Sequence, residues 1–391
     1  MLRTDYAVIG GGITGLSAAW ALRRLNREVV LLDQAEVGHR DGGSHGACRI
    51  FRHGYDDPQY VMLARRARDL WAELEAACGE RLLLPAPQLT FGPQQEQVRD
   101  AMLAARAACT ILTEDEAAER FPAIRTGGHA LLEPDSAVIA ASRALTALAA
   151  LAAPAGAGPL LPGGRVTALS DDGRRVLISA DGGDVQARRA IVCAGPWTAD
   201  LVGTAGITVP ATATLEQVSY LVLAGSPTAG SGPAAPAVAA AAPAAAGLPP
   251  GVPIFVHYGG EFPYGLPVPG SDRYKIGVHH GGPPVHPDRQ DHAEDAGLGL
   301  RIAQAARSIL PGYDPHPVAV ERCVYDNSPD TDFIVDRIGN IVIGSGTSGH
   351  GFKFGPLLGA WLAWLAAGET PDGERSAGAP PARFALSRFS A

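Results

Sequence analysis

Apolar runs separated by a glycine turn dominate the start of the chain. Asp5 to Ile9 is typical of a short buried strand, and Ile13 to Leu25 has the length of a helix. Glu28 to Leu32 is a second apolar run, which ends at Asp33. Because a strand, a helix and a strand follow one another, the pattern predicts a βαβ unit at the N-terminus.

A long helix is predicted after Asp57, which suits an N-cap, while Pro58 suits the first helical position. Apolar residues then recur at spacings of four and three, which places them on one face: Leu63, Ala67, Leu70, Leu74 and Ala77. The opposite face is rich in Arg, so we expect it to be exposed to solvent.

Strands that run into glycine turns return later in the chain. Ala190 to Val192 precedes one such turn at Gly195, and Asn340 to Ile343 precedes another at Gly344 to Gly346. A helix is predicted over Pro356 to Ala366. We interpret these separated segments as one nucleotide domain that comprises residues 1–85, 142–210 and 328–391.

The remaining segments, 86–141 and 211–327, are expected to form a second domain. Val218 to Leu223 and Tyr274 to Val278 alternate between apolar and polar residues, as strands do. Residues 225–253 shift to Ala, Pro and Gly. Repeated Pro forbids a continuous helix and the small side chains cannot build a core, so this stretch is predicted to be a flexible surface insertion.

Composition narrows the classes of function. The chain has 391 residues, is 46% hydrophobic and carries a net charge of -8. These values predict a large core and argue against a general nucleic-acid or anionic-membrane surface. An anionic ligand would need a local cluster of positive charge. Five cysteines without a C-x-x-C pair fit neither a disulfide framework nor a zinc site. With no apolar stretch long enough to span a membrane, we expect a cytoplasmic protein.

The glycine turn points to a dinucleotide. Gly10, Gly12 and Gly15 follow a strand and open a helix, and Asp33 ends the next strand. The glycines let the backbone approach a pyrophosphate, and Asp33 would accept bonds from ribose hydroxyls. The negative charge of Asp33 would repel the 2′-phosphate of NADP, so NADP is disfavoured as the ligand. The motif does not separate FAD from NAD, and an ordinary βαβ unit without a ligand stays an alternative.

Five blocks in the same order resemble the monomeric sarcosine oxidase and N-methyltryptophan oxidase family. The blocks are Gly43 to His53, Phe262 to Pro267, Tyr274 to His279, Cys323 to Tyr325, and Ser348 to Phe354. With the glycine turn, the match extends from Asp5 to Lys353. The resemblance implies an α/β chain, α+β overall: a Rossmann-like FAD-binding domain made of discontinuous segments, and a substrate domain with a mainly antiparallel sheet.

The resemblance also implies site residues. Cys323 would hold FAD through a thioether, and Arg49 would lie against the flavin. Arg52 and Lys353 would bind a substrate carboxylate, as two cations would, and Lys275 would face oxygen. Tyr264 and His279 would line the substrate cavity. The expected cofactor-binding residues are Gly10, Gly12, Gly15, Asp33, Ser44, His45, Arg49, Val166, Cys323, Gly349, His350, Gly351, Phe352 and Lys353.

From the residues alone, simpler interpretations stay open. Cys323 would be a buried inert thiol, and its attachment to a flavin needs a lowered pKa or a nearby cation. Lys275 would be a solvated strand residue. We assign no metal to His279 and His280, because adjacent strand residues point to opposite faces. Cys48 stands where the family has a hydroxyl residue, and the insertion leaves substrate choice open.

The sequence therefore predicts an FAD-dependent oxidation of a secondary amine, an N-methyl amino acid or a cyclic imino acid, with oxygen reduced to hydrogen peroxide. The expected partners are a small amine that bears a carboxylate, and oxygen; we expect a monomer that binds neither nucleic acid nor membrane. The alternatives are an FAD-dependent dehydrogenase or tailoring enzyme with another electron acceptor, an NAD-dependent dehydrogenase, and a flavin-binding module without catalysis.

Overall fold

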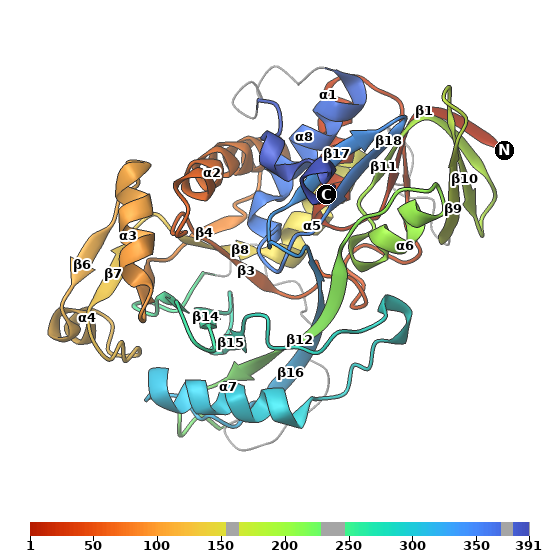
Figure 1. Ribbon diagram of the computed structural model, residues 1–391. Helices are drawn as coiled ribbons and strands as arrows, with labels where there is room; N and C mark the ends of the chain where they lie inside the picture. The colour runs from red at the N-terminus through yellow and green to blue at the C-terminus, as the bar shows by residue number, and fades with distance from the viewer. Residues whose placement is uncertain (154–163, 228–246, 369–377, 391) are drawn as a thin grey trace.

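Three β-sheets organise the parts of the chain described by a computed structural model, residues 1–153, 164–227, 247–368 and 378–390 (Figure 1). The residues between these ranges include 228–246, so most of the predicted flexible insertion lies outside the described residues. None of the described helices is long and apolar enough to cross a membrane.

The first sheet joins strands from the two ends and the middle of the chain. β1 (Leu2–Ile9) runs parallel to β2 (Val29–Leu32) and to β11 (Val185–Val192), and β11 runs parallel to β18 (Ile341–Ser345). β17 (Ile334–Ile338) adds an antiparallel edge, and β9 (Val166–Asp171) and β10 (Val176–Ala180) extend β11. The predicted βαβ unit and the discontinuous Rossmann-like arrangement are confirmed.

Helices cover this sheet. α1 (Ile13–Arg24) packs against both α8 (Gly355–Ala367) and α5 (Ala141–Ala152), while α6 (Thr198–Gly203) contacts β9 and β18. The facing residues of α1 and α8 are almost all buried, because both helices are apolar around most of their circumference. α1 begins directly after the glycine turn, as predicted.

The second sheet is mainly antiparallel, which confirms the expectation for the substrate domain. Its order is β16 (Ala319–Asn327), β12 (Thr212–Leu221), β15 (Tyr274–Val278), β14 (Pro263–Pro267), β13 (Ile254–His257), β5 (Gln88–Phe91), β7 (Ala130–Glu133) and β6 (Thr110–Leu112). Only the pair β13–β5 is parallel among these described strands. α7 (Ala296–Ile309) packs on β12 and β15, below them in Figure 1.

A small third sheet carries the segment with Arg49. It pairs β3 (Cys48–Phe51) and β4 (Leu83–Pro85) with β8 (Ala137–Ala140). Two short helices, α3 (Gln95–Ala104) and α4 (Glu114–Arg120), lie near β6 and β7. The boundaries proposed above for the two domains stay a prediction.

The long helix α2 (Pro58–Cys78) begins as predicted, with the Asp57 side chain accepting a hydrogen bond of 2.8 Å from the Gln59 N–H. Four of the five predicted apolar positions are buried. Ala77 is exposed, so that part of the prediction is wrong. The apolar repeat continues into the last turn, but Ala77 faces solvent there, while Cys78, where the helix ends, is partly buried against the core.

Candidate active site

A cavity of about 470 Å³ lies between the first and second sheets. The predicted site residues that line it are Gly10, Gly12, Asp33, Ser44, His45, Arg49, Arg52, Val166, Tyr264, Lys275, His279, Cys323, Gly349, His350, Gly351, Phe352 and Lys353. Gly15 does not line it. The fold therefore brings residues from opposite ends of the chain around one space of ligand size.

The glycine turn has no room for side chains. Gly10 has a φ of +105°, and a Cβ there would lie 2.2 Å from the carbonyl oxygen of Cys193. A Cβ at Gly15 would lie 2.0 Å from the Gly10 carbonyl oxygen. The prediction that Gly15 binds the cofactor is therefore corrected: Gly15 does not line the cavity, and its role is to let α1 pack closely on β1.

Asp33 and Ser44 fix the edge of this turn. The N–H of Gly11 and that of Ala35 both donate to the Asp33 carboxylate, and the Ser44 hydroxyl accepts from Ile13 N–H at 3.1 Å. No side chain caps α1 at Gly12. A helix N-terminus in which only the Ile13 N–H is bonded by a side chain, beside glycines whose space a Cβ would fill and with a carboxylate at the next strand end, fits a dinucleotide.

Arg49 is tied to the backbone of its own segment. Its guanidinium donates to the carbonyl oxygens of Cys48 at 3.0 Å, Gly43 at 3.1 Å and His45 at 2.6 Å. Its Cζ lies 5.4 Å from the ring centroid of Phe352, which comes from the far end of the chain. Arg49 therefore holds the loop before β3 against the turn that contains Phe352.

Arg52 and Lys353 converge on Tyr55. The Arg52 Cζ lies 4.1 Å from the Tyr55 ring centroid, and Lys353 Nζ donates to the Tyr55 hydroxyl at 3.0 Å. Both cations are buried, and neither has a carboxylate partner within 4.0 Å among the described residues. Burial, and then the nearby charge of Arg52, holds the pKa of Lys353 well below its usual value.

Lys275 is the second buried ammonium at the cavity. Its Nζ donates to the Cys48 carbonyl oxygen at 3.4 Å and lies 6.0 Å from the Tyr220 ring centroid. Burial, and then Arg49, lowers its pKa. The sequence contains only these two lysines, Lys275 and Lys353, among 32 basic residues of the Lys and Arg type. The interpretation of Lys275 as a solvated strand residue is wrong, since it is only 5% exposed.

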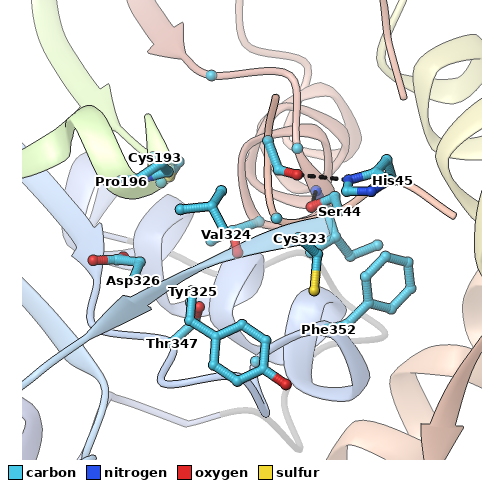
Figure 2. A pocket seen from close by; sticks show the side chains of 18 of the residues that line it. Ser44, His45, Cys193, Pro196, Cys323, Val324, Tyr325, Asp326, Thr347 and Phe352 are labelled. Carbon is cyan, nitrogen blue, oxygen red and sulfur yellow. Dashed lines mark hydrogen bonds between the residues drawn. The ribbon is translucent and has the colours of Figure 1, made fainter. Parts of the chain in front are cut away.

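Cys323 lies on β16, and its sulfur points between Tyr325 and Phe352 in Figure 2. Burial raises the pKa of the Cys323 thiol, while the charges of Arg49 and Lys275 act in the opposite direction. The nearby cations that attachment to a flavin would need are therefore present, although burial outweighs them in the free thiol.

Tyr264 and His279 form an aromatic wall. The Tyr264 hydroxyl is hydrogen-bonded to that of Tyr325, and the His279 ring lies 5.6 Å from the Tyr325 ring. Burial holds the pKa of His279 well below its usual value, so its ring is neutral at pH 7. The expectation that His279 and His280 point apart is wrong: β15 ends at Val278, and the two rings lie 4.0 Å apart.

His45 and His350 bond to backbone carbonyls. His45 Nδ1 lies 2.8 Å from the Gly42 oxygen (drawn in Figure 2), and His350 Nε2 lies 3.1 Å from the Thr331 oxygen. Burial, followed by Arg49, lowers the pKa of His45 to about 4. Burial also lowers the pKa of His350. Both rings are therefore neutral, which suits them to hold their loops in place.

Residues 5–365 match the model of the family described as FAD dependent oxidoreductase. The chain belongs to this family. It is 31% identical to peroxisomal sarcosine oxidase of Homo sapiens, over 98% of this chain and 96% of the relative. It is 30% identical to N-methyl-L-tryptophan oxidase of Salmonella heidelberg (strain SL476), over the full length of both. The resemblance stated from the motifs is confirmed.

Solved structures superpose on almost all of the chain. NikD, an unusual amino acid oxidase essential for nikkomycin biosynthesis, gives a TM-score of 0.80 at 24% identity and covers 97% of this chain and 98% of its own. Glycine oxidase from Geobacillus kaustophilus gives a TM-score of 0.78 at 20% identity, and the superposition covers 99% of this chain and 99% of the glycine oxidase chain. These similarities show the fold. Membership of the FAD dependent oxidoreductase family argues against the alternative of an NAD-dependent dehydrogenase.

Sequence reasoning missed several residues that support the site of this FAD-dependent oxidoreductase. Tyr55 and Tyr258 contact Arg52, and Tyr325 contacts Tyr264. Glu133, on β7, is buried and accepts hydrogen bonds from the N–H groups of His53 at 2.5 Å and Gly54 at 2.9 Å. No motif or spacing in the sequence singles out these supporting residues.

Proposed function

We propose that this FAD-dependent oxidoreductase oxidises a secondary amine or N-methyl amino acid to an imine, with oxygen reduced to hydrogen peroxide. The observation that carries the proposal is the pair of buried cations, Arg52 and Lys353, which meet at Tyr55 without a carboxylate partner among the described residues. A substrate carboxylate would supply the missing anion. The names of the two curated relatives agree with this substrate class.

The cavity residues fit FAD. Gly10 and Gly12 would face the pyrophosphate with the N-terminus of α1, and Asp33 would accept ribose hydroxyls. Ser44, His45 and Val166, together with the turn from Gly349 to Lys353, would line the rest. Bound FAD would supply the redox chemistry by taking a hydride from the carbon next to nitrogen. We further propose that Cys323 holds it covalently.

The protein would orient the amine and exclude water. Arg52 and Lys353 would hold the carboxylate, and Tyr264 and His279 would border the amine. No described residue stands out as a general base, since burial holds the pKa of His279 and of His350 well below its usual value and so makes both rings weak bases. Each ring also packs against an aromatic side chain. We therefore propose that the unprotonated amine is selected on binding, which predicts a rate that rises with pH.

Lys275 would serve the oxygen half of the reaction. Its ammonium is buried and anchored on the Cys48 carbonyl oxygen, so its position is fixed before oxygen arrives. A fixed positive charge stabilises the negative charge that oxygen gains with its first electron. The predicted residues that line the cavity require no residue of a second copy, and we propose that the enzyme acts as a monomer.

The decisive experiment reduces the purified protein without air. Sarcosine, N-methyl amino acids, pipecolate and proline are added anaerobically, the flavin absorbance is followed, and air is then admitted. We expect bleaching by carboxylate-bearing amines, little bleaching by the matching amides, and rapid peroxide release with air. Bleaching without peroxide would favour a dehydrogenase with another acceptor. No bleaching by any amine would reject the proposal.

A further inference from the structure

Tyr258 is a second aromatic side chain, besides Tyr55, that contacts the guanidinium of Arg52. Arg52 Nη1 donates a hydrogen bond of 2.6 Å to the Tyr258 hydroxyl, and the Arg52 Cζ lies 5.4 Å from the Tyr258 ring. The Tyr55 ring centroid lies 4.1 Å from the same Cζ, so two aromatic side chains contact the guanidinium. Tyr258 does not line the cavity, so its contact with a ligand would be indirect.

The Tyr258 hydroxyl is itself oriented. It donates to the carbonyl oxygen of Gly54 at 3.3 Å, which turns an oxygen lone pair toward Arg52. Gly54 N–H in turn donates to the buried carboxylate of Glu133 at 2.9 Å. Arg52 is therefore attached to a backbone turn that is fixed at two points.

Tyr258 is also anchored on the second sheet. It follows β13, and its N–H donates to the Phe91 carbonyl oxygen at 2.8 Å. Its ring packs against the edge of Phe262 with centroids 4.6 Å apart, and Phe262 borders the cavity. The position of Arg52, on the segment after β3, is thus set by a residue of the substrate sheet.

We propose that Tyr258 is a positioning residue for carboxylate recognition, which holds Arg52 in one orientation before the substrate binds. Only one of the five guanidinium N–H donors has a protein acceptor in the described chain, which leaves the others for a carboxylate. A cation fixed in advance loses little conformational freedom on binding, so the site favours small carboxylates over neutral isosteres. The inference rests on the proposed function.

The test replaces the hydroxyl and keeps the ring. For Tyr258→Phe we expect a KM for the best amine substrate about tenfold higher, with kcat changed less than about twofold. Acetate binding, titrated calorimetrically or through the flavin spectrum, should weaken by the same factor, while acetamide binding should not change. Tyr274→Phe is the matched control, because Tyr274 is fully buried and its hydroxyl donates to the Pro253 carbonyl oxygen at 2.8 Å, away from the cavity.

A double-mutant cycle separates positioning from a general loss of stability. In the Arg52→Met background, Tyr258→Phe should cause no further loss of acetate affinity, whereas independent effects would multiply. An unchanged acetate affinity in Tyr258→Phe, or full additivity in the cycle, would overturn the proposal. Acetate binding does not require turnover, so an enzyme that oxidises no amine would reject the proposed function and still test the role of Tyr258.

Discussion

Lys353 donates a hydrogen bond to Tyr55, a residue 298 positions away in the sequence. The same tyrosine packs its ring against Arg52, so one phenol links both cations of the proposed carboxylate site. The two charges repel each other, and the lowered pKa of Lys353 reflects burial first and then that repulsion, which the charge of Glu133 offsets only in part. A bound carboxylate would remove the repulsion, which makes binding and protonation mutually dependent.

Replacing Arg52 should affect binding more than chemistry. We expect Arg52→Met to raise KM for a carboxylate-bearing amine about 100-fold, because one partner of a buried charge pair is lost. Steady-state kinetics with an acid and its amide measure this, and the variant should no longer prefer the acid. Arg68→Met is the control, since Arg68 lies over Phe51 and donates to the Asp135 carbonyl oxygen outside the cavity. An unchanged KM in Arg52→Met would remove the proposed clamp.

The charge on Lys353 should be lost at a lower pH than that of a free lysine. Because burial lowers its pKa, raising the pH through that value neutralises the ammonium, and KM for carboxylate substrates should then rise. Lys353→Arg should abolish the rise, since a guanidinium stays protonated. Lysine labelled with ¹³C at Cε should give only two side-chain signals, one of which disappears in Lys353→Arg. A signal that titrates at the usual pKa would contradict the prediction.

Cys323 should retain the flavin in denatured protein. After acid precipitation the wild-type pellet should stay yellow, and Cys323→Ala should release the colour into the supernatant. Cys193→Ala is the matched control, because Cys193 is likewise a free thiol that borders the cavity. If the Cys323→Ala pellet keeps its colour, the attachment site is elsewhere.

Lys275 should act on oxygen and not on the amine. For Lys275→Met we expect anaerobic bleaching by substrate at a near-normal rate, while reoxidation by air slows about 100-fold or more. Stopped-flow absorbance measures the two half-reactions separately. Equal slowing of both would assign Lys275 to substrate binding, and no slowing of reoxidation would exclude the proposed role.

Local patterns were enough to predict the βαβ unit and the start of α2, because apolar strand segments, helix caps and glycine turns depend on residues that are close together in the sequence. The same local reasoning was wrong where an element ends. Ala77 continues the apolar repeat of α2 but projects into solvent, and His280 continues the sequence of β15 but adopts a φ of +54° after the strand has ended.

The supports of the site were not predictable in this way. Arg52 and Tyr258 are 206 positions apart and meet only because β13 pairs with β5 beside the third sheet. No spacing in the sequence encodes such a contact. The family resemblance predicted residues that line the cavity. It predicted none of the residues, such as Tyr258, that support them from outside the cavity.

Glu133 offers a test of that supporting layer. Burial raises the pKa of its carboxyl, but the hydrogen bonds and charge of His53 outweigh burial and leave the pKa below its usual value. The ionised form is therefore favoured by folding, and its stabilisation is present above the unfolded pKa and lost as pH falls through the folded pKa. At neutral pH we expect the Glu133→Gln substitution to lower the free energy of unfolding by about 2 kcal/mol.

Thermal unfolding of wild type and Glu133→Gln across pH measures this difference, which should shrink in acid as the wild-type carboxylate is protonated. Because Glu133 holds the Gly54 N–H and so the turn after Arg52, KM for carboxylate substrates should rise as well. Glu75→Gln is the control: Glu75 accepts from the N–H groups of Leu82 and Leu83 away from the cavity. It should lose stability and keep its KM, and a raised KM there would mean that general destabilisation, not the turn, controls binding.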